Sequence, residues 1–334
     1  MGRFEEVGPR TSVTEATRVD RIKPRARITR NIRALVVILL ALFLLMPVFV
    51  MVETAFKSRS DVVSVPPKFI FEPTLEGFVF LLTDRAVVSK ARMPEFQAAA
   101  EAGELGLFER IALRNGQEIT GPSNYVFRLR NSLIIAGLST ITSVTLALFA
   151  AYAFSRFDVL VKGDLLFFIL STRMLPAVVV TIPLFLMFRG LKLHDTHAGM
   201  ILLYTVFNLS LAVWLLKGFI DEIPREYEEA AMVDGYSRFQ AFYKLVIPQA
   251  LTGIAATAVF CLIFAWNEYA FALMLTSDKA RTAPPSIVTN LGRGGIEWST
   301  IAGGALGFLI PVVIVTFALR NYLLRGVTFG AVRK

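Results

Sequence analysis

Apolar residues in this chain gather in blocks of about twenty, and polar segments separate the blocks. A helix of about twenty residues spans the ~30 Å hydrocarbon core of a bilayer, where lipid offers the backbone no hydrogen-bond partner. The pattern therefore predicts an all-α membrane protein. Six transmembrane helices are expected, at residues 32–52, 131–154, 165–188, 198–220, 249–275 and 300–323.

The polar flanks predict how the chain is threaded through the membrane. Nine Lys and Arg residues lie among the first 33 positions, against four acidic residues. A basic flank directly before an apolar block marks the cytoplasmic side. No small-residue cleavage site follows the first block, so it is expected to be a retained helix rather than a signal peptide. Six spans then place both termini in the cytoplasm.

This threading divides the chain into predicted parts. They are a basic cytoplasmic N-terminal segment at 1–31, a first transmembrane helix at 32–52, an external (periplasmic) loop at 53–130, a five-helix core at 131–323 and a cytoplasmic tail at 324–334. Prolines in Val65-Pro66-Pro67 and Glu72-Pro73 exclude helix near the start of the external loop. Further along this loop, helix is expected at Met93–Ile111, and turns at Asn115-Gly116 and Gly121-Pro122.

Composition supports the same class of protein. Hydrophobic residues make up 55% of the chain, and mean hydropathy is +0.59. The net charge of +9 does not indicate a nucleic-acid partner, because the N-terminal cluster explains it and no basic patch with interleaved aromatics follows. Cys261 is the single cysteine, so no internal disulfide is possible. His194 and His197 beside Asp195 are too few ligands for a metal site.

A polar, helix-prone island at 221–248 lies between two apolar blocks on the predicted cytoplasmic side. Pro224 suits the first turn of a helix, acidic residues follow near the positive end of its dipole, and Gly235 can end it. Ser237 to Gln240 then read as a capping box that starts a second helix. The alternative is an amphipathic helix that only joins two spans. The residues of interest are Glu229, Ala230, Ala231, Asp234, Gly235, Leu245 and Pro248.

Written as a pattern, this island is E-A-A-x3-G-x9-[IL]-x-[IL]-P. It resembles the cytoplasmic coupling loop of permease subunits in binding-protein-dependent ABC importers. The chain from about residue 125 onward is similar to the carbohydrate-uptake, maltose-permease-like branch of that family. The matching stretches are Asn131–Ile134, Ala150–Phe157, Trp266–Tyr269 and Arg325–Lys334. An insertion at about 85–122 is longer than usual for this branch.

The resemblance implies a type I ABC importer permease fold in a bacterial cytoplasmic (inner) membrane. It implies import of a carbohydrate or a polyol by alternating access. Glu229 would pair with a basic residue in a homodimer of cytoplasmic ATPase subunits, which bind ATP and Mg²⁺. A second homologous permease subunit and a periplasmic solute-binding protein complete the implied assembly. The chain itself is expected to hold no cofactor and to catalyse nothing, and it has no G-x-x-x-x-G-K-[ST] motif.

Polar residues inside apolar blocks are candidates for the solute pathway, because a charge in a membrane span usually faces a partner or a wet cavity. Arg173 could serve as a pathway residue, or it could form an ion pair or extend toward the cytoplasm. Asn208 fits a helix–helix hydrogen bond as well as a ligand contact. Asn267 and Glu268 lie toward the external end of the fifth block, where Glu268 could simply reach the interface. Aromatic residues could stack on a sugar ring or anchor span ends, namely Tyr204, Phe207, Trp214 and Trp266.

Other functions explain less of the sequence. An ABC importer permease for a non-sugar solute, such as an amino acid, is the nearest alternative. A stand-alone secondary transporter predicts inverted halves with broken helices, and no internal repeat is evident. An intramembrane enzyme needs a catalytic set within the spans, and none is present. A receptor that binds through its long external loop leaves the island unexplained. The solute itself cannot be read from the sequence.

Overall fold

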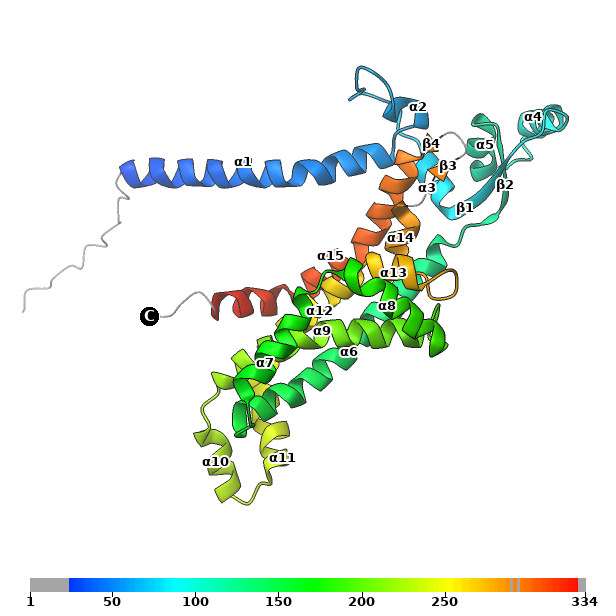
Figure 1. Ribbon diagram of the computed structural model, residues 1–334. Coiled ribbons are helices and arrows are strands. Elements are labelled where there is room, and N and C mark those ends of the chain that lie inside the picture. The colour runs from blue at the N-terminus through cyan, green and yellow to red at the C-terminus, as the bar shows by residue number, and fades with distance from the viewer. Residues whose placement is uncertain (1–23, 289–290, 293–294, 330–334) are drawn as a thin grey trace, which may run out of the picture. The chain divides into compact units, whose positions relative to one another are not determined.

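The computed structural model describes residues 24–288, 291–292 and 295–329 (Figure 1). Residues 1–23 of the predicted basic segment and residues 330–334 of the predicted tail lie outside the described part. The chain divides into two compact units, Met1–Val50 and Met51–Lys334, and each is described by itself.

Helix α1 (Pro24–Ala55) makes up the described part of the first unit and continues into the second. Its segment Asn31–Ala55 is long and apolar enough to span a membrane, with a mean hydropathy of 3.2. Large apolar side chains are exposed on all of its faces, which is the pattern of a helix that lies in lipid or against another helix. The predicted first span lies within α1.

Four long helices form the centre of the second unit, namely α6 (Tyr125–Arg156), α9 (His197–Asp221), α12 (Ile247–Trp266) and α15 (Trp298–Phe329). Helix α6 packs along α9, and α12 contacts both of them as well as α15. The contacts are close because small side chains of α6 are almost fully buried, at Ala136, Ser139, Ser143, Ala147 and Ala151. Two apolar clusters fill the two halves of this bundle.

The third predicted span is a bent pair of helices rather than one straight helix. Helix α7 (Lys162–Ser171) and a 3₁₀ turn at Thr172–Met174 precede α8 (Ala177–Gly190). The two halves meet at 95°. Pro176 lies at the break, where its ring and missing N–H prevent a continuous helix. Among the described residues there are thus five straight candidate spans, or six if the bent pair counts as one.

The fifth predicted span, 249–275, differs from the structure at both ends. Helix α11 (Arg238–Ala241), a π-helical turn at Phe242–Val246 and α12 follow one another directly, so the candidate span begins at Arg238. Pro248 therefore lies inside the first turn of α12 and does not start the span. At the other end, α12 stops at Trp266, and α13 (Ala270–Leu275) is a separate short helix.

The segment predicted to be external contains a small hairpin that the sequence did not indicate. Strand β1 (Thr83–Val87) pairs antiparallel with β2 (Gln117–Pro122). Gly121-Pro122, expected as a turn, is part of β2 and pairs with Asp84 and Thr83. The strands lack a clear apolar alternation and carry an irregularity at Asp84 and Arg85, which explains why the prediction was wrong.

Helices around this hairpin also differ from the prediction. The helix expected at 93–111 is two helices, α4 (Met93–Glu101) and α5 (Leu107–Arg114). Gly103 and Gly106 fall between them and interrupt the helical pattern. Asn115-Gly116 forms the expected turn, with Gly116 at a φ of 66°.

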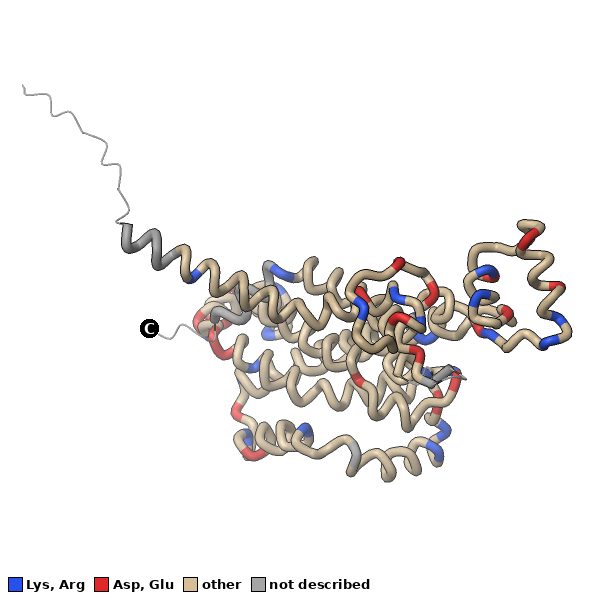
Figure 2. Tube along the Cα trace, turned by 90° about the horizontal axis from the view of Figure 1, so that it is seen from above, with Lys and Arg blue, Asp and Glu red and all other residues tan. Residues whose placement is uncertain are grey.

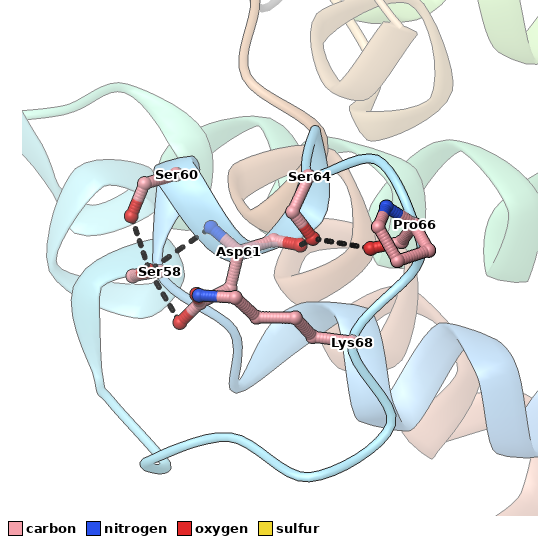
Figure 3. Close-up of polar contacts among 6 residues, drawn as sticks. All are labelled: Ser58, Ser60, Asp61, Ser64, Pro66 and Lys68. Atoms are coloured by element: carbon pink, nitrogen blue, oxygen red, sulfur yellow. Dashed lines mark hydrogen bonds and ion pairs between the residues drawn. The ribbon is translucent and has the colours of Figure 1, made fainter.

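Polar contacts hold the start of the external segment (Figure 3). Ser58 caps α2 (Arg59–Val62), because its hydroxyl accepts the Asp61 N–H at 3.2 Å and donates to the Asp61 carboxylate at 2.8 Å. Lys68 Nζ lies 2.6 Å from the other Asp61 oxygen. Lys68 and Ser58 together lower the pKa of Asp61. The following stretch has no helix until α3 (Glu76–Leu82), as its prolines predict.

Helix α15 packs closely on its neighbours at three glycines, Gly303, Gly304 and Gly307. A Cβ atom at Gly307 would lie only 2.7 Å from the Tyr125 hydroxyl, which donates to the Gly304 carbonyl at 2.8 Å. Gly303 lies against α3. Helix α14 (Ala283–Val288) and the short strands β3 (Leu291–Gly292) and β4 (Gly295–Ile296) lead into α15.

Charged residues of the second unit lie mainly toward the two ends of its helices, and the stretches between are largely uncharged (Figure 2). This distribution is what a bilayer requires, because charged side chains are costly in hydrocarbon. The hairpin lies near the start of α6, and α10 and α11 lie near its end (Figure 1). The candidate site residues therefore fall at one end of the bundle and in its interior.

Candidate functional site

The polar island at 221–248 forms a helix, a turn and a second helix beyond the ends of α6 and α9 (Figure 1). Helix α10 (Glu226–Val233) begins two residues after Pro224, so Pro224 lies before the helix and not in its first turn. Gly235 has a φ of 91°, which a residue with a Cβ rarely adopts. The Ser237–Gln240 capping box is present and starts α11.

Helix α10 presents two different faces. Glu229, Ala230 and Asp234 are exposed, whereas Glu228 and Ala231 are only 6% and 7% exposed. Of the remaining predicted residues, Gly235 and Pro248 are exposed and Leu245 is half-buried. The island therefore offers an outer face that carries two acidic side chains, Glu229 and Asp234, and Ala231 packs inward instead of contributing to that face.

A buried ion pair that sequence reasoning missed holds the inner face of α10. Arg156 Nε, near the end of α6, lies 2.5 Å from Glu228 Oε1. The Tyr152 hydroxyl donates to Glu228 Oε2 at 2.7 Å. Arg156 Nη2 also donates to the Ile223 carbonyl at 2.9 Å. Both members of the pair have side chains that are only 7% exposed.

Further hydrogen bonds join the same three elements. Arg225 Nη2 donates to the Ser155 carbonyl at 2.6 Å, and the Ser155 hydroxyl donates to Asp221 Oδ1 at 2.6 Å. Lys217 forms an ion pair with Asp221 within α9. The start of α10 is therefore fixed to the ends of both α6 and α9. Sequence spacing could not reveal this, because the paired residues lie more than 60 positions apart.

A partly open cavity of about 140 Å³ lies between the 3₁₀ turn, α9, α12 and α13 and brings three of the four candidate pathway residues together. It is lined by Arg173, Tyr204, Phe207, Asn208, Phe264, Ala265, Glu268 and Phe271. Arg173 lies on the 3₁₀ turn at the bend between α7 and α8, with its guanidinium 4.0 Å from the Phe264 ring centre. Its Nη1 is buried and has no hydrogen-bond partner in the described part of the chain.

The other polar residues of the cavity are bound to their neighbours. Glu268 accepts the Phe271 and Ala272 N–H groups at 2.8 and 3.0 Å and the Tyr204 hydroxyl at 2.6 Å. It therefore caps α13 and turns inward. Asn208 donates to the Cys261 carbonyl at 3.1 Å, which is a helix–helix hydrogen bond.

Asn267 and two of the four aromatic candidates, Trp214 and Trp266, do not line the cavity. Asn267 is exposed, donates to the Ile263 carbonyl of its own helix and does not line the cavity. Trp266 stacks on Phe308 at 4.7 Å, and Trp214 is exposed on the surface. Only Tyr204 and Phe207 of the four aromatic candidates line the cavity.

An acidic side chain outside the spans, that of Asp195, holds the loop that follows α13. Asp195 accepts four backbone N–H groups, those of residues 277–280, at 3.0 to 3.2 Å. Burial raises the pKa of Asp195, but the four donors outweigh burial and the net pKa is lowered. Nearby, His197 Nε2 lies 2.8 Å from Asn131 Oδ1. The described residues contain no group of three or more His, Cys, Asp or Glu that could hold a metal ion.

Comparison with known proteins identifies the class. The family described as "Binding-protein-dependent transport system inner membrane component" matches residues 143–329. The probable ABC transporter permease protein y4oR of Sinorhizobium fredii is 32% identical over 88% of this chain and 92% of its own length. The trehalose transport system permease protein SugB of Mycobacterium tuberculosis is 38% identical over 61% of this chain and 76% of its own.

A solved structure shares the fold. A chain of a bacterial ABC transporter involved in the import of the acidic polysaccharide alginate superposes with a TM-score of 0.64 and 19% identity. The match covers 90% of this chain and 98% of the other. The expected type I permease fold is therefore confirmed.

The chain belongs to the family of inner membrane components of binding-protein-dependent transport systems. It is a multi-pass ABC transporter permease, a transport subunit and not an enzyme. Membership of this family also makes its transport dependent on a binding protein.

Proposed function

We propose that this permease moves a carbohydrate or a polyol into the cell by alternating access. The names of relatives support this solute class, since SugB is a trehalose permease and another relative, from Thermococcus litoralis, is a trehalose/maltose permease. Tyr204, Phe207 and Asn208 beside Arg173 also suit a sugar, because aromatic faces and a few polar groups are what such a ligand needs. A non-sugar solute is the alternative.

We also propose that the outer face of α10 docks a homodimer of cytoplasmic ATPase subunits, which bind the ATP and Mg²⁺. The observation that carries this proposal is the exposure of Glu229, Ala230 and Asp234 on a helix that projects beyond the bundle. The side chains of Ala230 and Asp234 are short, so a groove of the ATPase can approach α10 closely. Glu229 supplies a negative charge that can pair with a basic residue of the ATPase. ATP shifts the pathway only if it binds the two states unequally.

A second permease subunit and a periplasmic solute-binding protein complete the proposed importer. Helix α1 supports this view, because its part within the first unit exposes apolar side chains on all of its faces. Lipid and a second subunit together would cover that surface. The cavity around Arg173 would then be completed by the partner permease on its open side.

Co-purification tests the assembly directly. The tagged chain is expressed with its neighbouring genes, extracted from the membrane, and its companions are identified by mass spectrometry. We expect a second permease and an ATPase, and the solute recovered from the accompanying binding protein names the cargo. A chain that purifies alone, folded, would refute the proposal and favour a solitary transporter.

Glu229→Ala tests the docking face. We expect less ATPase to co-purify and uptake to fall by about tenfold, which corresponds to ~1.4 kcal/mol of lost pairing. The chain should still be present in the membrane in normal amount, because Glu229 is exposed and makes no contact within the described chain that its loss would break. Glu226→Gln, at another exposed acid of α10, is the matched control. Normal uptake by Glu229→Ala would exclude the role.

A further inference from the structure

The two adjacent glutamates of α10 have opposite surroundings. Glu229 is exposed on the outer face, and Glu228 is buried on the inner face. A buried carboxylate is costly unless it is paired, and Glu228 is paired twice, with Arg156 at 2.5 Å and Tyr152 at 2.7 Å. Such an arrangement holds a short helix in one orientation more firmly than apolar contact alone.

Arg156 is bound in three directions at once. Its Nε donates to Glu228, its Nη2 to the Ile223 carbonyl and its Nη1 to the Ser155 hydroxyl at 3.0 Å. The guanidinium therefore joins α10 and the loop between α9 and α10 to α6. Because each donor direction is fixed by the planar group, a movement of α10 relative to α6 breaks several bonds together.

Aromatic packing supports the same junction. The Tyr152 ring lies 4.4 Å from that of Phe242, on the π-helical turn that leads into α12. Phe242 belongs to the apolar cluster that includes Leu148, Leu216 and Ile220 of α6 and α9. The polar junction thus sits directly on the core of this half of the bundle.

We propose that Glu228 is a positioning residue that makes α10 move as one rigid body with α6 and α9. The inference rests on the proposed docking of an ATPase on the outer face of α10. A movement of the ATPase then displaces α10 through its contact with Glu229. The Glu228–Arg156 pair makes α6 and α9 move with α10. Loss of Glu228 leaves the docking face in place and lets α10 move without α6.

Spin-label distances in the co-purified complex in nanodiscs test this directly. Labels are placed by Val233→Cys on α10 and Thr145→Cys on α6, which are both exposed, while the native Cys261 is buried. With Glu228 intact, we expect one narrow distance that stays the same without nucleotide and with Mg-ATP and vanadate. With Glu228→Gln, we expect a broader distribution and a nucleotide-dependent shift of more than about 2 Å. Glu226→Gln is the control and should behave as the parent.

A second variant separates tethering from folding. Glu228→Met with Arg156→Met replaces the buried pair by apolar side chains of similar length, a change that proteins often accept without loss of stability. We expect this double variant to reach the membrane in normal amount and still to show the broad, shifting distance. The proposal that Glu228 fixes α10 to α6 would be contradicted by an unchanged narrow distance in either variant. It would also be contradicted by a distance in the parent that shifts with nucleotide. If no ATPase co-purifies, the docking proposal fails, and the nucleotide-free distances still decide whether Glu228 holds α10.

Discussion

Arg173 is a residue whose surroundings compensate its charge poorly. Its guanidinium lies against Phe264, its Nη1 is buried without a partner, and the described residues give it no ion pair. The contact with an aromatic ring contributes about 0.5–2 kcal/mol, and an unsatisfied buried donor costs about 1–3 kcal/mol. These two free-energy contributions nearly cancel, so Arg173 adds little to the stability of the folded chain.

Arg173→Met is therefore expected to leave the thermal stability of the purified complex unchanged or slightly higher. Uptake should fall by about tenfold or more if the guanidinium contacts solute in the cavity, as the loss of one charged hydrogen bond of ~1.5–3 kcal/mol predicts. Transport into proteoliposomes and a melting curve measure the two effects. Arg189→Met, at an exposed arginine of α8, is the matched control. A lower melting temperature together with normal uptake would assign Arg173 a structural role.

At the scale of elements, Asp195 determines how the segment after α13 is held. Its carboxylate accepts four successive backbone N–H groups, so the loops at 191–196 and 276–282 are held together. In Asp195→Asn, one acceptor oxygen becomes an NH₂ group that faces N–H donors. We expect amide exchange at residues 277–280 to become about tenfold faster, which is ~1.4 kcal/mol in opening free energy. Asp278→Asn, at an exposed neighbour, should leave the exchange unchanged.

The same contact has a defined pH dependence. A folded-state pKa below the ordinary 3.8 means that the ionised Asp195 stabilises the loops at every pH above that value. The contribution is lost only as the pH falls from 3.8 through the lowered pKa. Exchange protection of residues 277–280, corrected for the intrinsic rate, should therefore be constant from neutral pH down to about pH 4. A loss of protection near pH 6 would contradict this assignment.

The elements also show what the sequence can and cannot predict. Apolar blocks located the spans, and the Ser237–Gln240 capping box located α11, because both signals are local. Pro176 indicates a kink in the third span, because proline disrupts a helix, but its 95° angle could not be predicted, and the stop at Trp266 was missed, since both depend on how neighbouring helices pack. The Glu228–Arg156 pair was missed for the same reason, as nothing in either segment specifies a partner so far along the chain. For the cavity, composition identified its polar residues, but only the fold brings them together.

At the scale of the whole molecule, most of the insertion can be replaced while the pairing of β1 with β2 is kept. The Arg92–Glu118 ion pair and the packing of α5 on β2 and α3 are lost with it. Val88 N–H donates to the Gly116 carbonyl at 3.0 Å, so these residues face each other at the end of β1 and β2. Residues 89–115, which include α4 and α5, can be replaced by Asn-Gly, the sequence that suits a two-residue hairpin turn. The ion pair of Arg85 with Glu297 at 2.9 Å stays intact, whereas removal of the full 85–122 segment would break it.

If the insertion contacts the solute-binding protein, the shortened importer should hydrolyse ATP at its normal basal rate and respond less to the loaded binding protein. We expect about tenfold more binding protein to be needed for half-maximal stimulation, equivalent to ~1.4 kcal/mol of lost contact. Titration of ATPase activity in proteoliposomes measures this shift. Glu95→Gln, at an exposed acid of α4, controls for a change of charge without a change of shape. An unchanged titration would show that the insertion is not a docking element. Stimulation would then have to depend on loops that the shortening keeps, such as 276–282, which Asp195 fixes at the same end of the bundle.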